Sequence, residues 1–233
     1  MTDTPNVTDT PRRRARRGAG EALRGQILAA ARTLLARHGT VESVSIRAVA
    51  DLVGVTPPSI YLHFADKDAL IDAVVADVFT ELDERMNAGP ADAHPMDRLC
   101  YQGMAYIQFA LDSPGHYLLA TTNVRTESGD VDMVLRTAAF TRLRDTVEEC
   151  MAEGVFTPGD PTPVAIQLWA AAHGIASLMI AKPYLPWGDP NEIAYRVLGA
   201  AAMGISINGY LGDPDPTGFV AWRKSLPSRG GEG

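Results

Sequence analysis

Hydrophobic residues recur at helical spacing along most of the chain, and this pattern predicts an all-α fold. From about residue 21 to residue 38 they fall on one helix face, and Gly39 follows as a stop signal. A longer stripe of eight apolar positions runs over residues 70–86. Further helices are expected at about residues 97–112, 115–123, 131–153, 162–182 and 190–210. No strand pattern or internal repeat is visible, and about nine helices are predicted in all.

The segment 45–64 predicts two short helices joined by a tight turn. Ser45 suits the N-cap of the first helix, and Gly54 suits the left-handed position that ends it. Thr56 is the expected cap of the second helix, and Pro57 fits its first position. This layout is that of a helix-turn-helix, whose second helix enters the DNA major groove. A helical hairpin with a purely structural role would show the same signals and is the alternative.

The formal net charge of −7 conceals an uneven distribution. Residues 11–67 hold ten Lys/Arg against four Asp/Glu, a net charge of +6, whereas residues 68–233 hold eleven against twenty-two, a net charge of −11. A basic N-terminal module attracts a polyanion such as DNA, although a solvated basic tail is also possible. The basic arm predicted at residues 1–18, which we expect to be disordered, contains Arg12, Arg13, Arg14, Arg16 and Arg17.

Composition narrows the class of protein further. The chain has 233 residues, of which 46% are hydrophobic and 21% charged, as in ordinary globular proteins. The weakly polar stretch 165–181 contains three polar residues and predicts a buried helix rather than a membrane span. The first eleven residues lack a signal-peptide pattern, and Cys100 and Cys150 show no metal or redox spacing. A cytoplasmic protein with free thiols, no metal and no cofactor is therefore expected.

Two motifs carry a family resemblance. Residues 45–50, 54–56 and 60–64, followed by Lys67 and Leu70, resemble the DNA-binding signature of TetR-type transcriptional regulators. The resemblance implies an N-terminal three-helix DNA-binding domain, joined through the fourth helix to a ligand-binding core, in a homodimer. It also implies a four-helix dimer interface made from the last two long helices, which are rich in Ala and Gly.

The second motif, Trp169-Ala-Ala-Ala-His173-Gly174, resembles the W-x-x-x-H-G (WHG) motif of one C-terminal domain class in that family. Trp169 and His173 are four residues apart and share a helix face. Either they form a pocket wall in which His173 offers a polar group to a ligand, or they are a structural pair. Gly174 is expected to let a neighbouring helix approach closely.

The resemblance assigns DNA contacts to the helix-turn-helix. Arg47, Tyr61 and Lys67 are expected to anchor phosphates, which positions the protein without specifying sequence. Consecutive prolines at the start of the second helix depart from the usual pattern, because they remove N–H donors and offer only apolar contact to thymine methyl groups. Tyr61 as a core ring, Lys67 as a solvated side chain and His63 packed beneath the helix are the alternatives. The candidate DNA-binding residues are Arg47, Thr56, Pro57, Pro58, Ser59, Tyr61, Leu62, His63 and Lys67.

A ligand pocket is expected among the middle helices, at about residues 97–112, 131–153 and 162–182. Aromatic, Met and His side chains gather there, although most of them would also suit a plain core. The candidate ligand-binding residues are Trp169, His173, Tyr101, Met104, Phe109, His116, Tyr117 and Phe140, with Met133 a further position of the same kind.

These observations predict four segments: a basic arm (1–18), a helix-turn-helix domain (19–65), a ligand-binding and dimerisation domain (66–211) and a flexible tail (212–233). The predicted function is a ligand-responsive transcriptional repressor. It binds a pseudo-palindromic operator as a homodimer and is released by a small hydrophobic effector that is neutral or weakly cationic. A helical enzyme and a DNA-binding protein without an effector are the alternatives. The enzyme is disfavoured because the five histidines lack metal spacing and no nucleophile or phosphate-loop motif is present.

Overall fold

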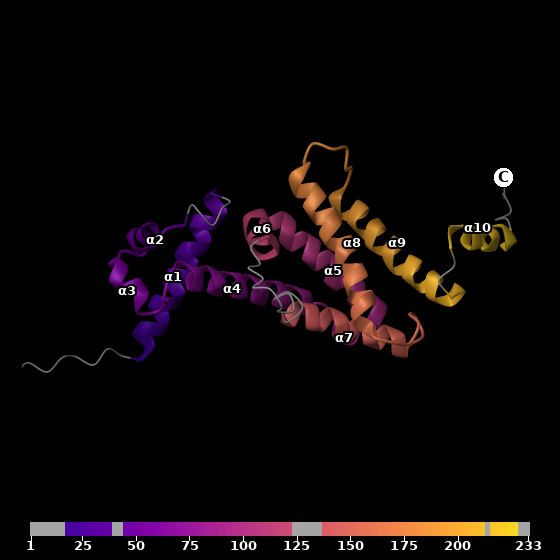
Figure 1. Ribbon diagram of the computed structural model, residues 1–233, viewed down its shortest axis with the longest axis horizontal. Coiled ribbons are helices and arrows are strands. Elements are labelled where there is room, and N and C mark those ends of the chain that lie inside the picture. Colours follow the sequence, from indigo (N-terminus) through magenta and orange to yellow (C-terminus); the bar gives the residue numbers. More distant parts are fainter. Residues whose placement is uncertain (1–16, 39–43, 123–136, 213–214, 228–233) are drawn as a thin grey trace, which may run out of the picture. The chain divides into compact units, whose positions relative to one another are not determined.

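The computed structural model describes residues 17–38, 44–122, 137–212 and 215–227, and in those residues it contains ten helices and no strand (Figure 1). The predicted all-α fold is confirmed. The chain forms two compact units, residues 1–74 and 75–233. The boundary between these units lies inside one uninterrupted helix, α4 (Lys67–Asn87). Most of the basic arm and Met133 lie outside the described residues.

The first unit consists of α1 (Arg17–His38), α2 (Ile46–Val53), α3 (Pro57–Tyr61) and the start of α4. The second helix packs against both α1 and α3. Val49 and Ala50 of α2 are fully buried, as is Ile60 of α3. Because these side chains are removed from water together, the two short helices are held in a fixed relation although neither is long enough to be stable alone.

The turn between α2 and α3 has the predicted cap chemistry. The Ser45 hydroxyl accepts a hydrogen bond from the Ala48 amide at 3.1 Å. Gly54 adopts the left-handed conformation, with φ of 78°, and its amide donates to the Ala50 carbonyl at 2.9 Å. A side chain at Gly54 would be strained in that backbone conformation, so glycine is required for the sharp turn into α3.

Thr56 occupies the cap position of α3, but its side chain makes no hydrogen bond to the helix backbone. Its hydroxyl lies instead 3.1 Å from the hydroxyl of Ser59. Two prolines open α3 and have no N–H to cap, so the helix start is satisfied without that bond. The next helix is capped by Asp66, whose carboxylate accepts a hydrogen bond from the Ala69 amide at 2.8 Å.

The second unit is built around α5 (Pro95–Asp112), α7 (Ala138–Ala152), α8 (Pro161–Ala181) and α9 (Pro190–Leu211). α8 packs against the other three, and α6 (Pro114–Thr122) packs against α5. By length and composition α8 could span a membrane, but its packing makes it a core helix, as the sequence predicts. The helix expected from residue 131 begins at Ala138, after a Thr137 cap; residues 123–136 are outside the described ranges.

The final segment, expected as a flexible tail from residue 212, contains a tenth helix, α10 (Pro216–Ser225). Asp215 caps it by accepting from the Gly218 amide at 2.7 Å, and Pro216 takes the first helical position. Arg223 and Lys224 lie in the last turn, where positive charge interacts favourably with the helix dipole. None of its side chains is buried, so local capping rather than core packing defines this helix.

Candidate nucleic-acid interface and ligand cavity

The end of α3 and the turn after it present large side chains to solvent. Leu62 is 85% exposed and Tyr61 is 53% exposed, while Ile60 beside them is fully buried. This exposure contradicts the alternative in which Tyr61 is a core ring. Among the other candidates, Arg47, Thr56 and Pro58 are exposed, and Pro57, Ser59, His63 and Lys67 are half-buried.

His63 lies against the first helix of the same unit. A Cβ atom at Gly20 of α1 would stand 3.9 Å from the His63 Cε1 atom. Next to it, the buried ring of Phe64 carries the Arg24 guanidinium over its face at 5.1 Å. This position of His63 agrees with the alternative in which it packs beneath the helix, and it leaves Thr56, Ser59 and Tyr61 as the polar groups presented by α3.

These groups have the chemistry needed to touch base edges and phosphates. Hydroxyls donate and accept, so Thr56 and Ser59 can pair with several bases, and the Tyr61 phenol can reach a phosphate. The exposed Leu62 offers apolar contact of the kind that thymine methyl groups accept. Arg47 adds a fixed positive charge on the neighbouring helix α2. The exposed groups of α3 thus stand beside the buried residues that pack α2 and α3 together.

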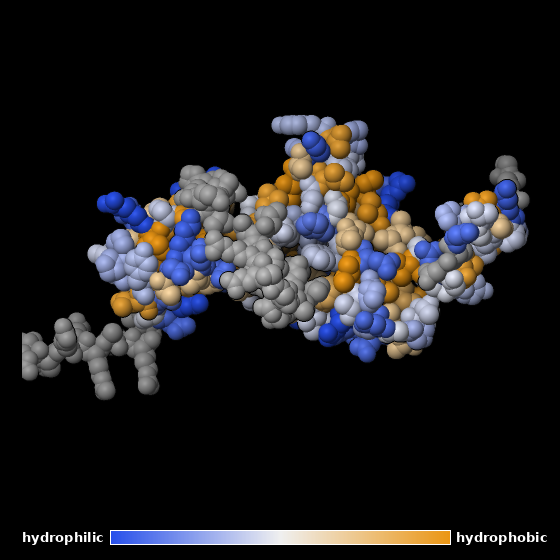
Figure 2. Space-filling view, viewed as in Figure 1, coloured by the Kyte–Doolittle hydropathy of each residue, from blue (hydrophilic) through white to orange (hydrophobic). Residues whose placement is uncertain are grey.

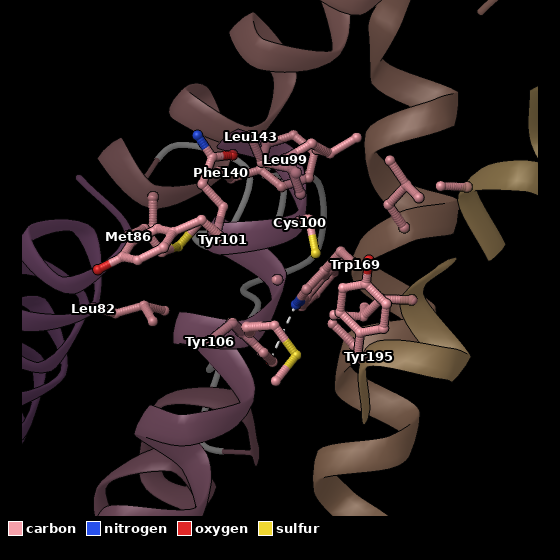
Figure 3. Close-up of a pocket in the computed structure, with 18 of the residues that line it drawn as sticks. Leu82, Met86, Leu99, Cys100, Tyr101, Tyr106, Phe140, Leu143, Trp169 and Tyr195 are labelled. Atoms are coloured by element: carbon pink, nitrogen blue, oxygen red, sulfur yellow. Dashed lines mark hydrogen bonds between the residues drawn. The ribbon is translucent and has the colours of Figure 1, made fainter. Parts of the chain in front are cut away.

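The second unit holds a cavity of about 500 Å³ between α4, α5, α7, α8 and α9 (Figure 3). Its walls are predominantly apolar, and the volume suits a drug-sized molecule. Four of the predicted ligand-binding residues line it: Tyr101, Met104, Phe140 and Trp169. Lining residues that the sequence analysis does not single out include Leu82, Met86, Leu99, Cys100, Gln102 and Tyr195. Apolar spacing marks most of these only as core positions, because a cavity wall and a packed core use the same residue types.

The other four predicted ligand-binding residues are not among those that line this cavity: His173, Tyr117, Phe109 and His116. Phe109 is only 1% exposed, and the Arg85 guanidinium lies over its ring at 5.2 Å. His116 is half-buried on α6 and away from the lining set. Tyr117 and His173 are held by hydrogen bonds to each other behind the cavity wall.

That hydrogen-bond network joins α5, α6 and α8. The Trp169 indole Nε1 donates to the Tyr106 hydroxyl at 3.1 Å, a bond drawn in Figure 3. The Tyr117 hydroxyl lies 2.7 Å from His173 Nδ1 and 3.0 Å from the Ser177 hydroxyl. Burial raises the pKa of Tyr106 and of Tyr117 and lowers the pKa of His173, so all three are neutral near pH 7.

The Trp169–His173 pair therefore has two different roles. Its ring centroids are 5.9 Å apart, but only Trp169 faces the cavity. His173 is part of the hydrogen-bonded support, which corresponds to the structural alternative for that residue. A Cβ atom at Gly174 would meet no atom of the described residues within 4 Å, so none of the described helices makes the expected close approach there.

Gln102, which the sequence analysis does not single out, is the buried polar residue of the cavity wall. It is 4% exposed, and its amide nitrogen donates to the Thr146 hydroxyl on α7 at 2.8 Å. Thr146 in turn donates to the Arg142 carbonyl at 3.0 Å. Nearby, burial raises the pKa of the Cys100 thiol, with Asp97 adding to the effect, so that thiol is also neutral.

The C-terminal half of α4 is tied to the cavity helices by charged side chains. Arg142 of α7 donates to Asp83 at 2.8 Å and to Asn87 at 2.8 Å. Arg85 of α4 donates to Asp112 of α5 at 2.9 Å. Hydrogen bonds from Gln108 and Arg85 hold the pKa of Asp112 below its usual range, so this contact persists across the neutral range. These contacts connect α4 directly to α5 and α7.

Comparison with known proteins agrees with this description. Residues 27–74 match the family described as bacterial regulatory proteins, tetR family, and residues 101–201 match the tetracyclin repressor-like C-terminal domain. These matches cover the helix-turn-helix and most of the cavity helices. The chain is a TetR-family DNA-binding transcriptional regulator, a class of non-enzymatic proteins, so the helical-enzyme alternative is wrong.

Solved structures share this fold. One is a protein of unknown function from Rhodococcus sp. RHA1, 27% identical, covering 79% of this chain and 95% of its own, with a TM-score of 0.69. A bacterial regulatory protein in the tetR family from Rhodococcus RHA1 is 21% identical, covering 78% and 96%, with a TM-score of 0.59. A tetR-family transcriptional regulator from Streptomyces coelicolor is 19% identical, covering 88% and 96%, with a TM-score of 0.58. No curated protein matched the sequence.

Proposed function

We propose that the protein is a repressor that binds a pseudo-palindromic operator as a homodimer and leaves it when a small hydrophobic effector binds. The observation that carries the DNA-binding part is the exposed surface of α3 beside the buried Ile60. The hydroxyls of Thr56 and Ser59, together with Tyr61, are its base- and phosphate-facing groups. Arg47 and Lys67 anchor the backbone on either side.

The cavity of about 500 Å³ supports the effector part of the proposal. Its walls are mostly apolar, and its buried phenol and thiol groups are neutral, while the carboxylate of Asp97 belongs to the lining. A neutral or weakly cationic hydrophobic molecule suits such a wall better than an anion, because none of the described lining residues offers a positive charge. Trp169, Tyr101, Met104 and Phe140 contact it.

Helix α4 connects the proposed DNA-binding function with the proposed effector-binding function. Its first two turns belong to the first unit and the rest belongs to the second, where Arg142 and Arg85 link it to α7 and α5. An effector that binds one arrangement of α5 and α7 more tightly shifts the population of α4 positions. In a dimer, this changes the spacing of the two α3 helices and weakens operator binding.

The proposed dimer interface is the exposed side of α8 and α9. Figure 2 shows hydrophobic residues gathered over these two helices. Leu178 of α8 is 51% exposed, and Met203 and Tyr210 of α9 are 59% and 85% exposed. Met203 and Tyr210 are seven residues apart and so lie on the same side of α9. A two-fold axis through this surface would cover them against a second copy.

The proposal also includes the class of the C-terminal domain and the location of the protein in the cell. We place the C-terminal domain in the W-x-x-x-H-G class, supported by Trp169, His173 and Gly174 within the matched residues 101–201. We also propose a cytoplasmic location, where an operator is reached and the two thiols stay reduced.

Selection from a pool of random DNA duplexes tests the DNA-binding part. The purified full-length chain should enrich duplexes with two inverted half-sites about one helical turn apart, on the order of 34–36 Å. The same selection with Ser59→Ala should enrich a different half-site, whereas Thr33→Ala, a control on α1, should enrich the original one. Enrichment of no sequence, or of a single undivided site, would contradict the proposal.

A further inference from the structure

The side chain of Gln102 indicates which polar group an effector should carry, which the apolar lining alone does not indicate. The Thr146 hydroxyl has one proton, and this proton is donated to the Arg142 carbonyl at 3.0 Å. Thr146 can therefore only accept from Gln102, 2.8 Å away, which requires the amide nitrogen of Gln102 to face Thr146. The position of the amide oxygen follows from this, because it must point the other way.

Among the residues that the structure describes, none donates a hydrogen bond to the amide oxygen of Gln102. It is buried, and the whole residue is only 4% exposed. Of the described residues that line the cavity, Gln102 is the one whose buried polar atom lacks a hydrogen bond. The buried hydroxyl of Tyr106, by comparison, already accepts from Trp169. An unpaired buried acceptor destabilises the state that leaves it unpaired, so a molecule that supplies a donor is favoured there.

We propose that Gln102 is the specificity-determining residue of the cavity, and that it selects hydrophobic effectors carrying a hydroxyl or N–H donor. The inference rests on the proposed effector function and names the ligand chemistry. Carboxylates are excluded because the Gln102 oxygen and Asp97 both repel them. Purely apolar molecules and ethers of the same shape bind less tightly, because they leave the buried oxygen without a hydrogen-bond donor.

Two probes of nearly equal shape test this: 1-naphthol, which has a donor, and 1-methoxynaphthalene, which has none. Titration calorimetry on the full chain should give about tenfold tighter binding of 1-naphthol. In Gln102→Met, which keeps the size and removes the acceptor, the two affinities should become equal, mainly through loss of 1-naphthol binding. Met104→Trp, which fills cavity space, should weaken both probes together and shows that they occupy this site.

Thr146→Val provides a second variant if Gln102→Met does not fold, as judged by circular dichroism. It frees the Gln102 amide to rotate and to present its N–H group to the ether oxygen of 1-methoxynaphthalene, so the preference for 1-naphthol should fall. Equal binding of both probes to the unmodified chain would overturn the role of Gln102 and leave the effector cavity standing. Failure of both probes to bind at their solubility limits would overturn the effector cavity itself and this inference with it.

Discussion

The indole nitrogen of Trp169 donates a hydrogen bond to the hydroxyl of Tyr106, 3.1 Å away. This bond joins α8 to α5 across the cavity wall, and both residues line the cavity. Tyr106 also lies 3.2 Å from His173 Nδ1, so the wall is continuous with the buried network that includes Tyr117. This network therefore links α5, α6 and α8 at the cavity wall.

Trp169→Ala should abolish the effect of an effector on operator binding and leave operator affinity nearly unchanged. The substitution removes the ring that the ligand contacts, but it lies far along the chain from the DNA-binding residues. Tyr106→Phe, which keeps the ring and loses only the hydrogen bond, should weaken the response less. Fluorescence anisotropy of a labelled operator, with and without effector, measures both. If Trp169→Ala unfolds, or responds normally, Trp169 is a core residue and not a contact.

Lys67→Ala should weaken binding to specific and nonspecific duplexes to a similar degree. Lys67 begins α4, beside α3, and a phosphate contact there carries no sequence information. Loss of one contact should lower the slope of log affinity against log salt by about one unit. Deleting residues 1–17 should lower the slope further, because that segment holds five arginines. Unchanged slopes for both variants would show that neither group contacts DNA.

Two glycine substitutions in the first unit should have opposite effects on stability. Gly54→Ala should lower the free energy of unfolding by about 1 kcal/mol, because the φ of 78° is unfavourable for any residue with a Cβ. Gly25→Ala should raise it by about 0.5–1 kcal/mol, because Gly25 lies within α1 and a Cβ there meets no atom within 4 Å. Denaturant unfolding followed by circular dichroism distinguishes the two. A stabilising Gly54→Ala would show that the turn does not need the left-handed conformation.

The burial of His173 makes the stability of the protein depend on pH. Burial lowers its pKa in the folded state, so the unfolded state takes up a proton more readily as the pH falls below about 6.5. The stabilisation is present at neutral pH and is lost as the pH falls toward the folded pKa. The stability difference between the unmodified chain and His173→Gln should shrink between pH 7.5 and pH 5. A difference that stays constant would mean that His173 does not titrate differently on folding.

Local signals made the helix-turn-helix predictable from the sequence. The caps at Ser45 and Asp66, the left-handed Gly54 and the eight-residue apolar stripe of α4 depend on short-range chemistry, and all of them are present. The short helix α10 was not expected, because Gly and Pro dominate the composition around it. Its Asp215-Pro216 start is the signal that could have revealed it.

The cavity was only partly predictable, for a physical reason. Aromatic and Met residues at helical spacing suit a wall and a core equally, so Trp169 and Phe140 were found while Phe109 proved to be packed under Arg85. His173 was expected either to offer a ligand a polar group or to be structural, and its Nδ1 atom lies within hydrogen-bond distance of the Tyr117 hydroxyl. Gln102 was missed because its unpaired oxygen depends on Thr146, a residue 44 positions away on another helix.

The central claim is that effector binding in the cavity controls operator binding through α4. The direct measurement is the affinity of the full chain for its selected operator, by anisotropy, with and without saturating 1-naphthol or a tighter donor-bearing ligand found by thermal-shift screening. A coupling free energy of about 1–3 kcal/mol predicts that saturation weakens operator binding about 5- to 150-fold, and that Met104→Trp, with its filled cavity, does not respond. Operator affinity that is the same with the cavity empty and saturated would contradict the account.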